Sequence, residues 1–93
     1  MKVTREESGK RGAFNAIEDD KKIGKMSYFW GDENTFVIDH TGINTAFQGQ
    51  GVGKKLFLSA IDYAREKNCK IVPACSFAAS MFRRHPECAD VLK

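Results

Sequence analysis

With 93 residues, the chain has room for one domain, which we place at residues 1–93, and its core must be small. Its hydrophobic content of 42% and charged content of 29% are typical of a soluble globular protein, and no window reaches the roughly 18 apolar residues that span a bilayer. The net charge of +3 favours an anionic ligand but is too low for a dedicated nucleic-acid binder. The charged N-terminus lacks the apolar segment of a signal peptide, so we expect a cytoplasmic protein without membrane association.

The first half of the chain predicts a meander of short strands. Residues 14–18 and 23–30 alternate between apolar and polar side chains, and Asp19 and Asp20 between them are turn formers, so these segments predict an antiparallel hairpin. Residues 35–41 predict a third strand, and their continuous apolar run indicates that both of its faces are covered. Residues 1–12 are expected to be a poorly ordered or edge segment.

In the second half the hydrophobic period changes to that of a helix. From Val52 onward every fourth position is apolar, which predicts an amphipathic helix of about 16 residues that ends near Asn68. Residues 70–75 predict a short buried strand parallel to the third one, because a helix connects the two. Ser76 is expected to cap a second helix, which Pro86 ends. The predicted order is β-β-β-α-β-α, an α/β (α+β) fold with helices packed on a mixed sheet.

A glycine-rich turn precedes the first predicted helix. Three of the six residues 48–53 are glycine, although glycine destabilises helices. An anion would explain them, because the first turn of a helix offers free backbone N–H groups and glycine lets a phosphate approach closely. A flexible loop is the alternative, since the dinucleotide-binding and P-loop patterns are both absent.

The spacing Gln48-x-x-Gly51-x-Gly53 resembles the pyrophosphate loop Arg/Gln-x-x-Gly-x-Gly/Ala of the GNAT acetyltransferase superfamily. The flanking segments Asp39-His40-Thr41-Gly42-Ile43, Val72-Pro73-Ala74-Cys75-Ser76-Phe77 and Arg83-Arg84-His85-Pro86-Glu87 are similar to those of a small GNAT-like family. That family keeps the core that binds coenzyme A (CoA) and lacks the later strands of full-length acetyltransferases. The resemblance implies a minimal GNAT fold and acetyl-CoA as cofactor.

The same resemblance implies a set of cofactor-binding residues. Backbone N–H groups at Gly42 and Ile43 are expected to face the thioester and pantetheine, and the glycine-rich turn is expected to face the pyrophosphate. The implied residues are Thr41, Gly42, Ile43, Gln48, Gly49, Gln50, Gly51, Val52, Gly53, Lys54, Phe77, Arg83 and Arg84. For the basic residues a solvated surface position is the alternative.

Two side chains are candidates for catalysis. Cys75 ends a predicted strand just before a helix N-terminus, where a thiolate is favoured, so it can accept an acetyl group or protonate the departing CoA. The alternative is a small buried hydrophobe. His40 is a candidate general base. It is expected on one strand face with Phe36 and Ile38, and the family fold implies a position near Cys75. The alternative is a core histidine that is hydrogen-bonded to a backbone carbonyl.

We therefore expect an acyltransferase that moves an acetyl group from acetyl-CoA to an unidentified amine. A non-catalytic module that binds or senses acyl-CoA is the alternative, because the acceptor-binding half of larger acetyltransferases is missing. A small domain that binds nucleic acid or protein is disfavoured by the low charge. The odd number of cysteines, without the paired spacing of a zinc site, predicts no metal. A monomer or weak dimer is expected.

Overall fold

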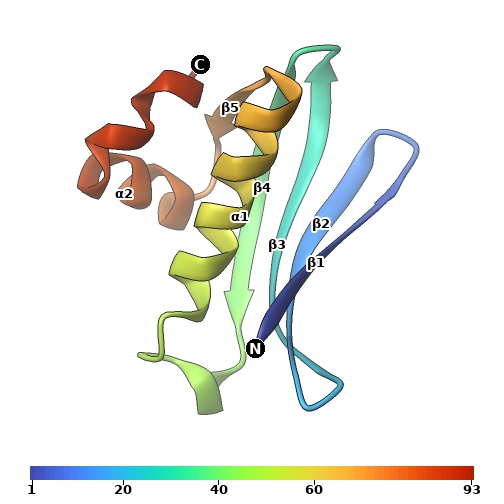
Figure 1. Ribbon diagram of the computed structural model, residues 1–93, viewed down its shortest axis with the longest axis vertical. Helices are drawn as coiled ribbons and strands as arrows, with labels where there is room; N and C mark the ends of the chain where they lie inside the picture. Colours follow the sequence, from blue (N-terminus) through green and yellow to red (C-terminus); the bar gives the residue numbers. More distant parts are fainter.

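The computed structural model describes residues 1–93, and its sheet is built from a meander followed by one parallel strand (Figure 1). Turns at glycines and at aspartates with positive φ, 50° at Asp19 and 64° at Asp20, join the first strands. The strands are β1 (Lys2–Ser8), β2 (Arg11–Glu18), β3 (Lys21–Asp32), β4 (Thr35–Ile43) and β5 (Lys70–Pro73), in the sheet order β1-β2-β3-β4-β5. Only β4 and β5 are parallel, which confirms the predicted mixed sheet.

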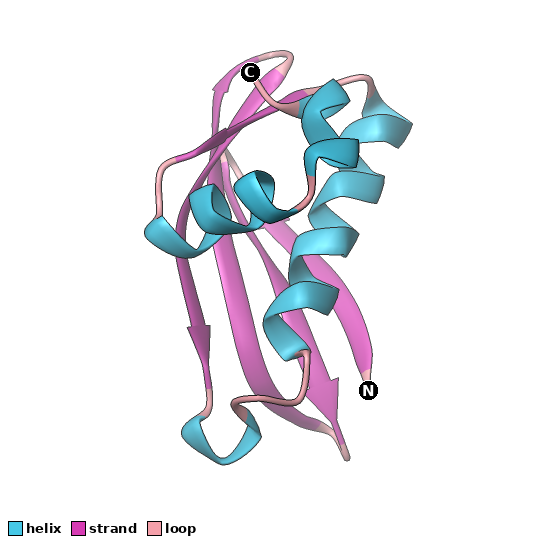
Figure 2. Ribbon diagram, turned by 90° about the vertical axis from the view of Figure 1, so that its left-hand side faces the viewer, coloured by secondary structure: helices cyan, strands magenta, loops and turns pink.

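Both α-helices lie on one face of this sheet (Figure 2). They are α1 (Val52–Lys67) and α2 (Ser76–Arg84), with short 3-10 helices η1 (Thr45–Phe47) and η2 (Pro86–Val91). The buried residues of α1 form the predicted stripe, and Asn68 ends the helix in the left-handed conformation at φ 55° and ψ 44°, so both predictions are confirmed. No helix combines the length and the apolar character that crossing a membrane requires.

The structure corrects three details of the prediction. The order gains a strand, because Lys2–Ser8 pairs with β2 and forms the edge of the sheet. Helices cover only one face of β4, so the expectation of two covered faces is wrong, and Val37 on the other face is half-buried. The N-cap of α2 is Cys75 rather than Ser76, because the Cys75 sulfur accepts the hydrogen bond from the backbone N–H of Ala78.

Aromatic rings from three strands and α1 fill the core near β1: Phe14, Tyr28, Trp30, Phe36 and Tyr63. Glu7 on β1 closes this cluster, since its carboxylate accepts hydrogen bonds from the Tyr28 hydroxyl at 2.7 Å and the Trp30 indole at 2.8 Å. Burial and the bond to Glu7 raise the pKa of Tyr28 to about 12, against the effect of Arg5. These contacts fix the edge strand and leave the opposite end of the sheet to form the site.

Candidate functional site

The site begins where β4 and β5 part. Their pairing ends at Ile38 and Pro73, but β4 continues as far as Ile43. The backbone N–H groups of Ala74 and Cys75 both donate to the Ile38 carbonyl, at 2.9 and 3.1 Å, and thereby turn the chain away from β4 into α2. The last residues of β4 therefore have no strand beside them on that side, and their backbone groups there are free to bond a ligand.

A groove of about 780 Å³ lies at this parting, between the end of β4, the start of α1 and one side of α2. Of the residues implied for cofactor binding, those that line it are Thr41, Ile43, Gln48, Gly49, Gly51, Val52, Gly53, Lys54, Phe77 and Arg84. Gly42, Gln50 and Arg83 do not line it, and neither do Cys75 and His40.

Three further lining residues escaped the sequence interpretation: Phe47, Met81 and His85. The sequence does contain a pattern that could have identified Met81 and His85, because both follow Phe77 at spacings of four residues. Such spacings put side chains on one face of a helix and its end. Phe47 lies in η1, where no such periodicity exists.

The glycine-rich turn leaves the N-terminus of α1 open at the groove. Gly49 and Gly51 have positive φ values of 82° and 79°, a region that other residues rarely adopt, so these two glycines are required by the backbone. Gly51 is the N-cap of α1, no side chain caps the helix, and no acidic residue occupies its first turn. The free N–H groups and the positive end of the helix dipole therefore remain available to an anion.

Gly53 has a different reason to be glycine. A Cβ at this position would lie 2.5 Å from the Cζ atom of Phe77, so the aromatic ring of α2 sits directly on the first turn of α1. Phe77 and Gly53 together set the width of the groove at this point. The basic side chains of Lys54 and Arg84 also line the groove, which adds positive charge near the open helix N-terminus.

Cys75 contacts Thr41, which lines the groove. The Cys75 sulfur is 3.5 Å from the Thr41 hydroxyl and accepts from the N–H of Ala78 at 3.4 Å. Of the three cysteines, Cys69 and Cys88 are buried, whereas Cys75 is partly exposed. The thiol is thus held by one side-chain hydroxyl and the first turn of α2, next to a residue that lines the groove.

The expected position of His40 is wrong, because a β-bulge lies just before it. Ser27 pairs with His40 while Tyr28 pairs with Ile38, so Asp39 is an extra residue on β4. The bulge turns the exposed His40 to the face of the sheet that no helix covers and turns Thr41 toward the groove. Thr41, and not His40, is therefore the neighbour of Cys75.

Asp39 is held by hydrogen bonds on the same face of the sheet, which no helix covers. Its carboxylate accepts hydrogen bonds from Arg11 at 2.7 Å and from the Ser27 hydroxyl at 2.8 Å. Partial burial works against ionisation, but these two hydrogen bonds outweigh it and lower the pKa of Asp39. The ion pair joins β2 to the bulge and fixes the direction of the residues that follow.

No cluster of three or more histidine, cysteine or acidic side chains is placed to hold a metal ion.

Comparison with known proteins gives a consistent result. Residues 13–91 match the model of the GCN5-related N-acetyl-transferase family. The chain is similar to the solved structure of a GCN5-like protein from Staphylococcus aureus, with 32% identity, a TM-score of 0.72, and coverage of 97% of this chain and 87% of that one. No match is found among curated protein sequences.

Two larger solved structures share the fold. One is a ribosomal-protein-alanine N-acetyltransferase from Brucella melitensis biovar Abortus 2308, with 16% identity, a TM-score of 0.67 and coverage of 83% of this chain. The other is a GNAT family acetyltransferase from Elizabethkingia anophelis with acetyl-CoA bound, with 22% identity, a TM-score of 0.64 and coverage of 84%. The chain spans only 62% and 53% of the lengths of these two proteins.

The contact between Gly53 and Phe77 predicts the outcome of a double-mutant cycle. Gly53→Ala should lower the free energy of unfolding by about 1–3 kcal/mol, because the new methyl group overlaps the ring. Adding Phe77→Leu should recover most of that loss. Gly49→Ala, which meets no atom within 4 Å but has a positive φ, should cost roughly 1–2 kcal/mol that Phe77→Leu does not recover. Urea unfolding followed by Trp30 fluorescence measures all of these; equal recovery in both backgrounds would contradict the packing role.

Proposed function

The chain belongs to the GCN5-related N-acetyltransferase family, and from this premise we propose that it binds acetyl-CoA in the groove and transfers the acetyl group to an amine. The observation that carries the proposal is the groove itself, which joins an uncapped helix N-terminus to the free edge of β4. The first feature suits a pyrophosphate and the second suits the amide groups of a pantetheine chain. Acetyl-CoA contains both chemical groups in that order.

The residues of the groove divide between the two ends of such a ligand. Backbone N–H groups from Gly51 to Lys54 would receive the pyrophosphate, with the Lys54 and Arg84 side chains supplying charge. The backbone of Thr41 and Ile43 would bond the pantetheine amides, which places the thioester near Cys75 at the far end. Arg83 is assigned no contact, because it does not line the groove.

Transfer requires that the amine lose a proton and that the CoA sulfur gain one. In direct transfer the N–C bond forms as the C–S bond breaks. The Cys75 thiol can supply the proton to the leaving CoA sulfur and then recover a proton from the amine. In the covalent alternative the Cys75 sulfur itself takes the acetyl group and its proton ends on CoA. The amine then attacks the new thioester, the bond between the acetyl carbon and Cys75 breaks, and the amine's proton returns to the Cys75 sulfur. The N–H of Ala78 and the Thr41 hydroxyl are placed to stabilise charge on the Cys75 sulfur in either case. We propose no proton transfer between His40 and Cys75, because they face opposite sides of the sheet.

The assignment of the phosphate end predicts which basic residues matter for affinity. Lys54→Met and Arg84→Met should each weaken CoA binding about tenfold, since each removes a charge-assisted contact. Their sequence neighbours give matched controls, because Lys55 and Arg83 do not line the groove. Lys55→Met and Arg83→Met should change the affinity less than about twofold. Isothermal titration calorimetry with CoA measures all four variants, and equal losses in the two pairs would contradict the assignment.

The Cys75 role predicts the product of incubation with acetyl-CoA alone. If the covalent route operates, intact-protein mass spectrometry should show one acetyl group, and peptide mapping should locate it on Cys75. Cys75→Ala should abolish the adduct, whereas Cys69→Ala and Cys88→Ala should keep it, because both of those thiols are buried. Thr41→Val should slow its formation.

An absent adduct together with unchanged amine acetylation by Cys75→Ala would rule out both roles of this thiol. A module that only binds or senses acyl-CoA would show CoA affinity without adduct and without turnover of any amine.

A further inference from the structure

The strand β1 forms one edge of the sheet, and no other strand lies beyond it. Six of its seven residues are exposed, and only Val3 is half-buried. Its register with β2 is continuous, and β1 contains no proline and no bulge that would interrupt a further strand. An uncovered edge of this kind presents a row of unpaired backbone N–H and C=O groups, to which another strand can bond.

The free backbone groups of this edge belong to the odd-numbered residues. The N–H of Trp30 donates to the Lys10 carbonyl at 2.8 Å, so the Lys10 backbone is turned toward β3 and that of Arg11 toward β1. In an antiparallel ladder the N–H and C=O of one residue point to the same side, and this side alternates along the strand. The even-numbered residues of β1, which are the partners of Arg11 and of every second residue after it, therefore bond β2. Val3 and Arg5 present their backbone groups at the edge.

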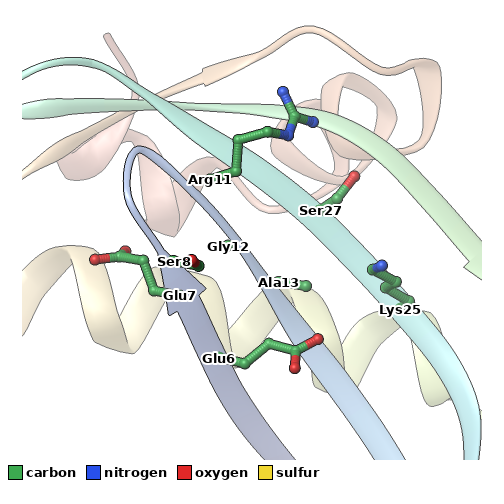
Figure 3. A pocket seen from close by; sticks show the side chains of 8 residues that line it. All are labelled: Glu6, Glu7, Ser8, Arg11, Gly12, Ala13, Lys25 and Ser27. Carbon is green, nitrogen blue, oxygen red and sulfur yellow. The ribbon is translucent and has the colours of Figure 1, made fainter.

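The side chains of β1 alternate between the two faces of the sheet. Glu7 is directed to the face of the core, where its carboxylate accepts the hydrogen bond of Tyr28. Since successive side chains point to opposite faces, Lys2, Thr4 and Glu6 lie on the face that no helix covers. Figure 3 shows the side chains of Glu6 and Glu7 extending in opposite directions.

The two charged side chains of β1 on the helix-free face are not held by strong partners. Lys2 makes no ion pair. Glu6 is 62% exposed, and its one ion-pair partner, Lys22, is 3.9 Å away. The Glu6 side chain borders a polar hollow of about 400 Å³ rather than a packed surface (Figure 3). Both charges are therefore free to turn toward a neighbour at the edge.

We propose that β1 pairs with β1 of a second copy of the chain, antiparallel and centred on Thr4, so that the two five-stranded sheets join into one. In this register Val3 of each copy lies opposite Arg5 of the other, and their free N–H and C=O groups bond each other. Lys2 of each copy lies opposite Glu6 of the other. The two-fold symmetry forms this pair of opposite charges twice.

The charges of β1 select this register over its neighbours. Centring the pair on Arg5 or on Glu6 would place that residue directly opposite its own copy, and centring it on Val3 would pair no opposite charges. A parallel pair in register would place every charge opposite its like. Opposite charges that face each other across two strands stabilise the pairing, and like charges destabilise it.

The charged residues on the other face of β1 take no part in this selection. Arg5 is held within its own chain, since it donates to the Tyr28 hydroxyl at 3.0 Å and its guanidinium carbon lies 4.4 Å from the centre of the Tyr63 ring. Glu7 is held in the same way by Tyr28 and Trp30. Only Lys2 and Glu6 therefore carry charge that a second copy can use.

The dimer does not depend on the proposed acetyl transfer. The groove lies at the end of β4, which β2 and β3 separate from the edge strand. Pairing of the two β1 strands therefore leaves the groove of each copy open.

An exchange of charges tests the proposal, with sedimentation equilibrium of the full chain as the measurement. We expect a dimer that forms at protein concentrations on the order of 100 µM. Glu6→Lys and Lys2→Glu should each weaken it about tenfold, because each turns two attractive pairs into repulsive ones. The double variant with both changes should restore the dissociation constant to within about twofold, since the pairs are then reversed but intact.

Glu33→Lys and Lys21→Glu are the matched controls, because they change the net charge equally at exposed positions outside β1. Each should leave the dissociation constant within about twofold. Circular dichroism verifies that all variants fold.

NMR on a mixture of isotope-labelled and unlabelled chains tests the register. The α-protons of facing Thr4 residues approach closely in a pair without hydrogen bonds, so a contact between Thr4 of the two copies is expected. The amide protons of Val3 and Arg5 should exchange with solvent more slowly as the protein concentration rises.

A chain that stays monomeric up to about 1 mM would overturn the proposal. So would controls that weaken the dimer as strongly as the β1 variants, a double variant that does not recover, or exchange at Val3 and Arg5 that does not depend on protein concentration. Titration with CoA separates this inference from the proposed function, because the β1 variants should keep the CoA affinity of the unmodified chain. Absence of CoA binding by the unmodified chain would contradict the proposed function and leave the dimer standing.

Discussion

The parting of β4 from β5 is the feature on which the rest of the site depends. Two backbone N–H groups, from Ala74 and Cys75, converge on the single carbonyl of Ile38, and β5 stops at Pro73. The chain then enters α2 instead of continuing the ladder. This geometry creates the free edge of β4 and sets Cys75 at the start of α2. It also places α2 across from the open N-terminus of α1. The groove between β4, α1 and α2 therefore follows from this one local change in strand pairing.

The bulge at Asp39 is the second constraint, and it decides which residue belongs to which face. Without the extra residue, His40 would share the helix-covered face with Phe36 and Ile38. With it, Thr41 contacts Cys75, and His40 lies opposite Ser27 on the face that no helix covers. The ion pair between Arg11 and Asp39 joins the bulge to β2.

The sequence correctly predicted those elements that are determined by residues close together in the chain. The stripe of α1, its end at Asn68, the hairpin turn at Asp19 and the parallel pairing through a helical connection follow from periodicity and turn chemistry, and the structure confirms them. The turn at residues 48–53 also indicated an open helix N-terminus correctly. For residues 1–12 the sequence left open a poorly ordered or an edge segment, and the structure shows the edge strand β1 there. Its strand was not predicted, because nearly all of its residues are exposed and its apolar and polar residues hardly alternate.

The sequence predictions were wrong or incomplete where strand register or a contact between distant residues determines the position of a side chain. A one-residue bulge reverses the face of every later side chain, and nothing in the composition of residues 35–43 marks its position. Cys75 replaces Ser76 as the N-cap because β5 ends earlier than its apolar run suggests. Gly53 was attributed to phosphate approach, whereas the ring of Phe77, distant in the chain, also requires it.

In the proposed complex, CoA lies along the groove from the start of α1 to the free edge of β4. A titration of isotopically labelled protein with CoA, followed through its backbone amides by NMR, tests this most directly. We expect the largest shifts at residues 49–54 and at Thr41 and Ile43, with little change at Glu6 and Ser8 on the opposite face. The largest shifts around Glu6, Ser8 and Arg11, with none at residues 49–54, would contradict it.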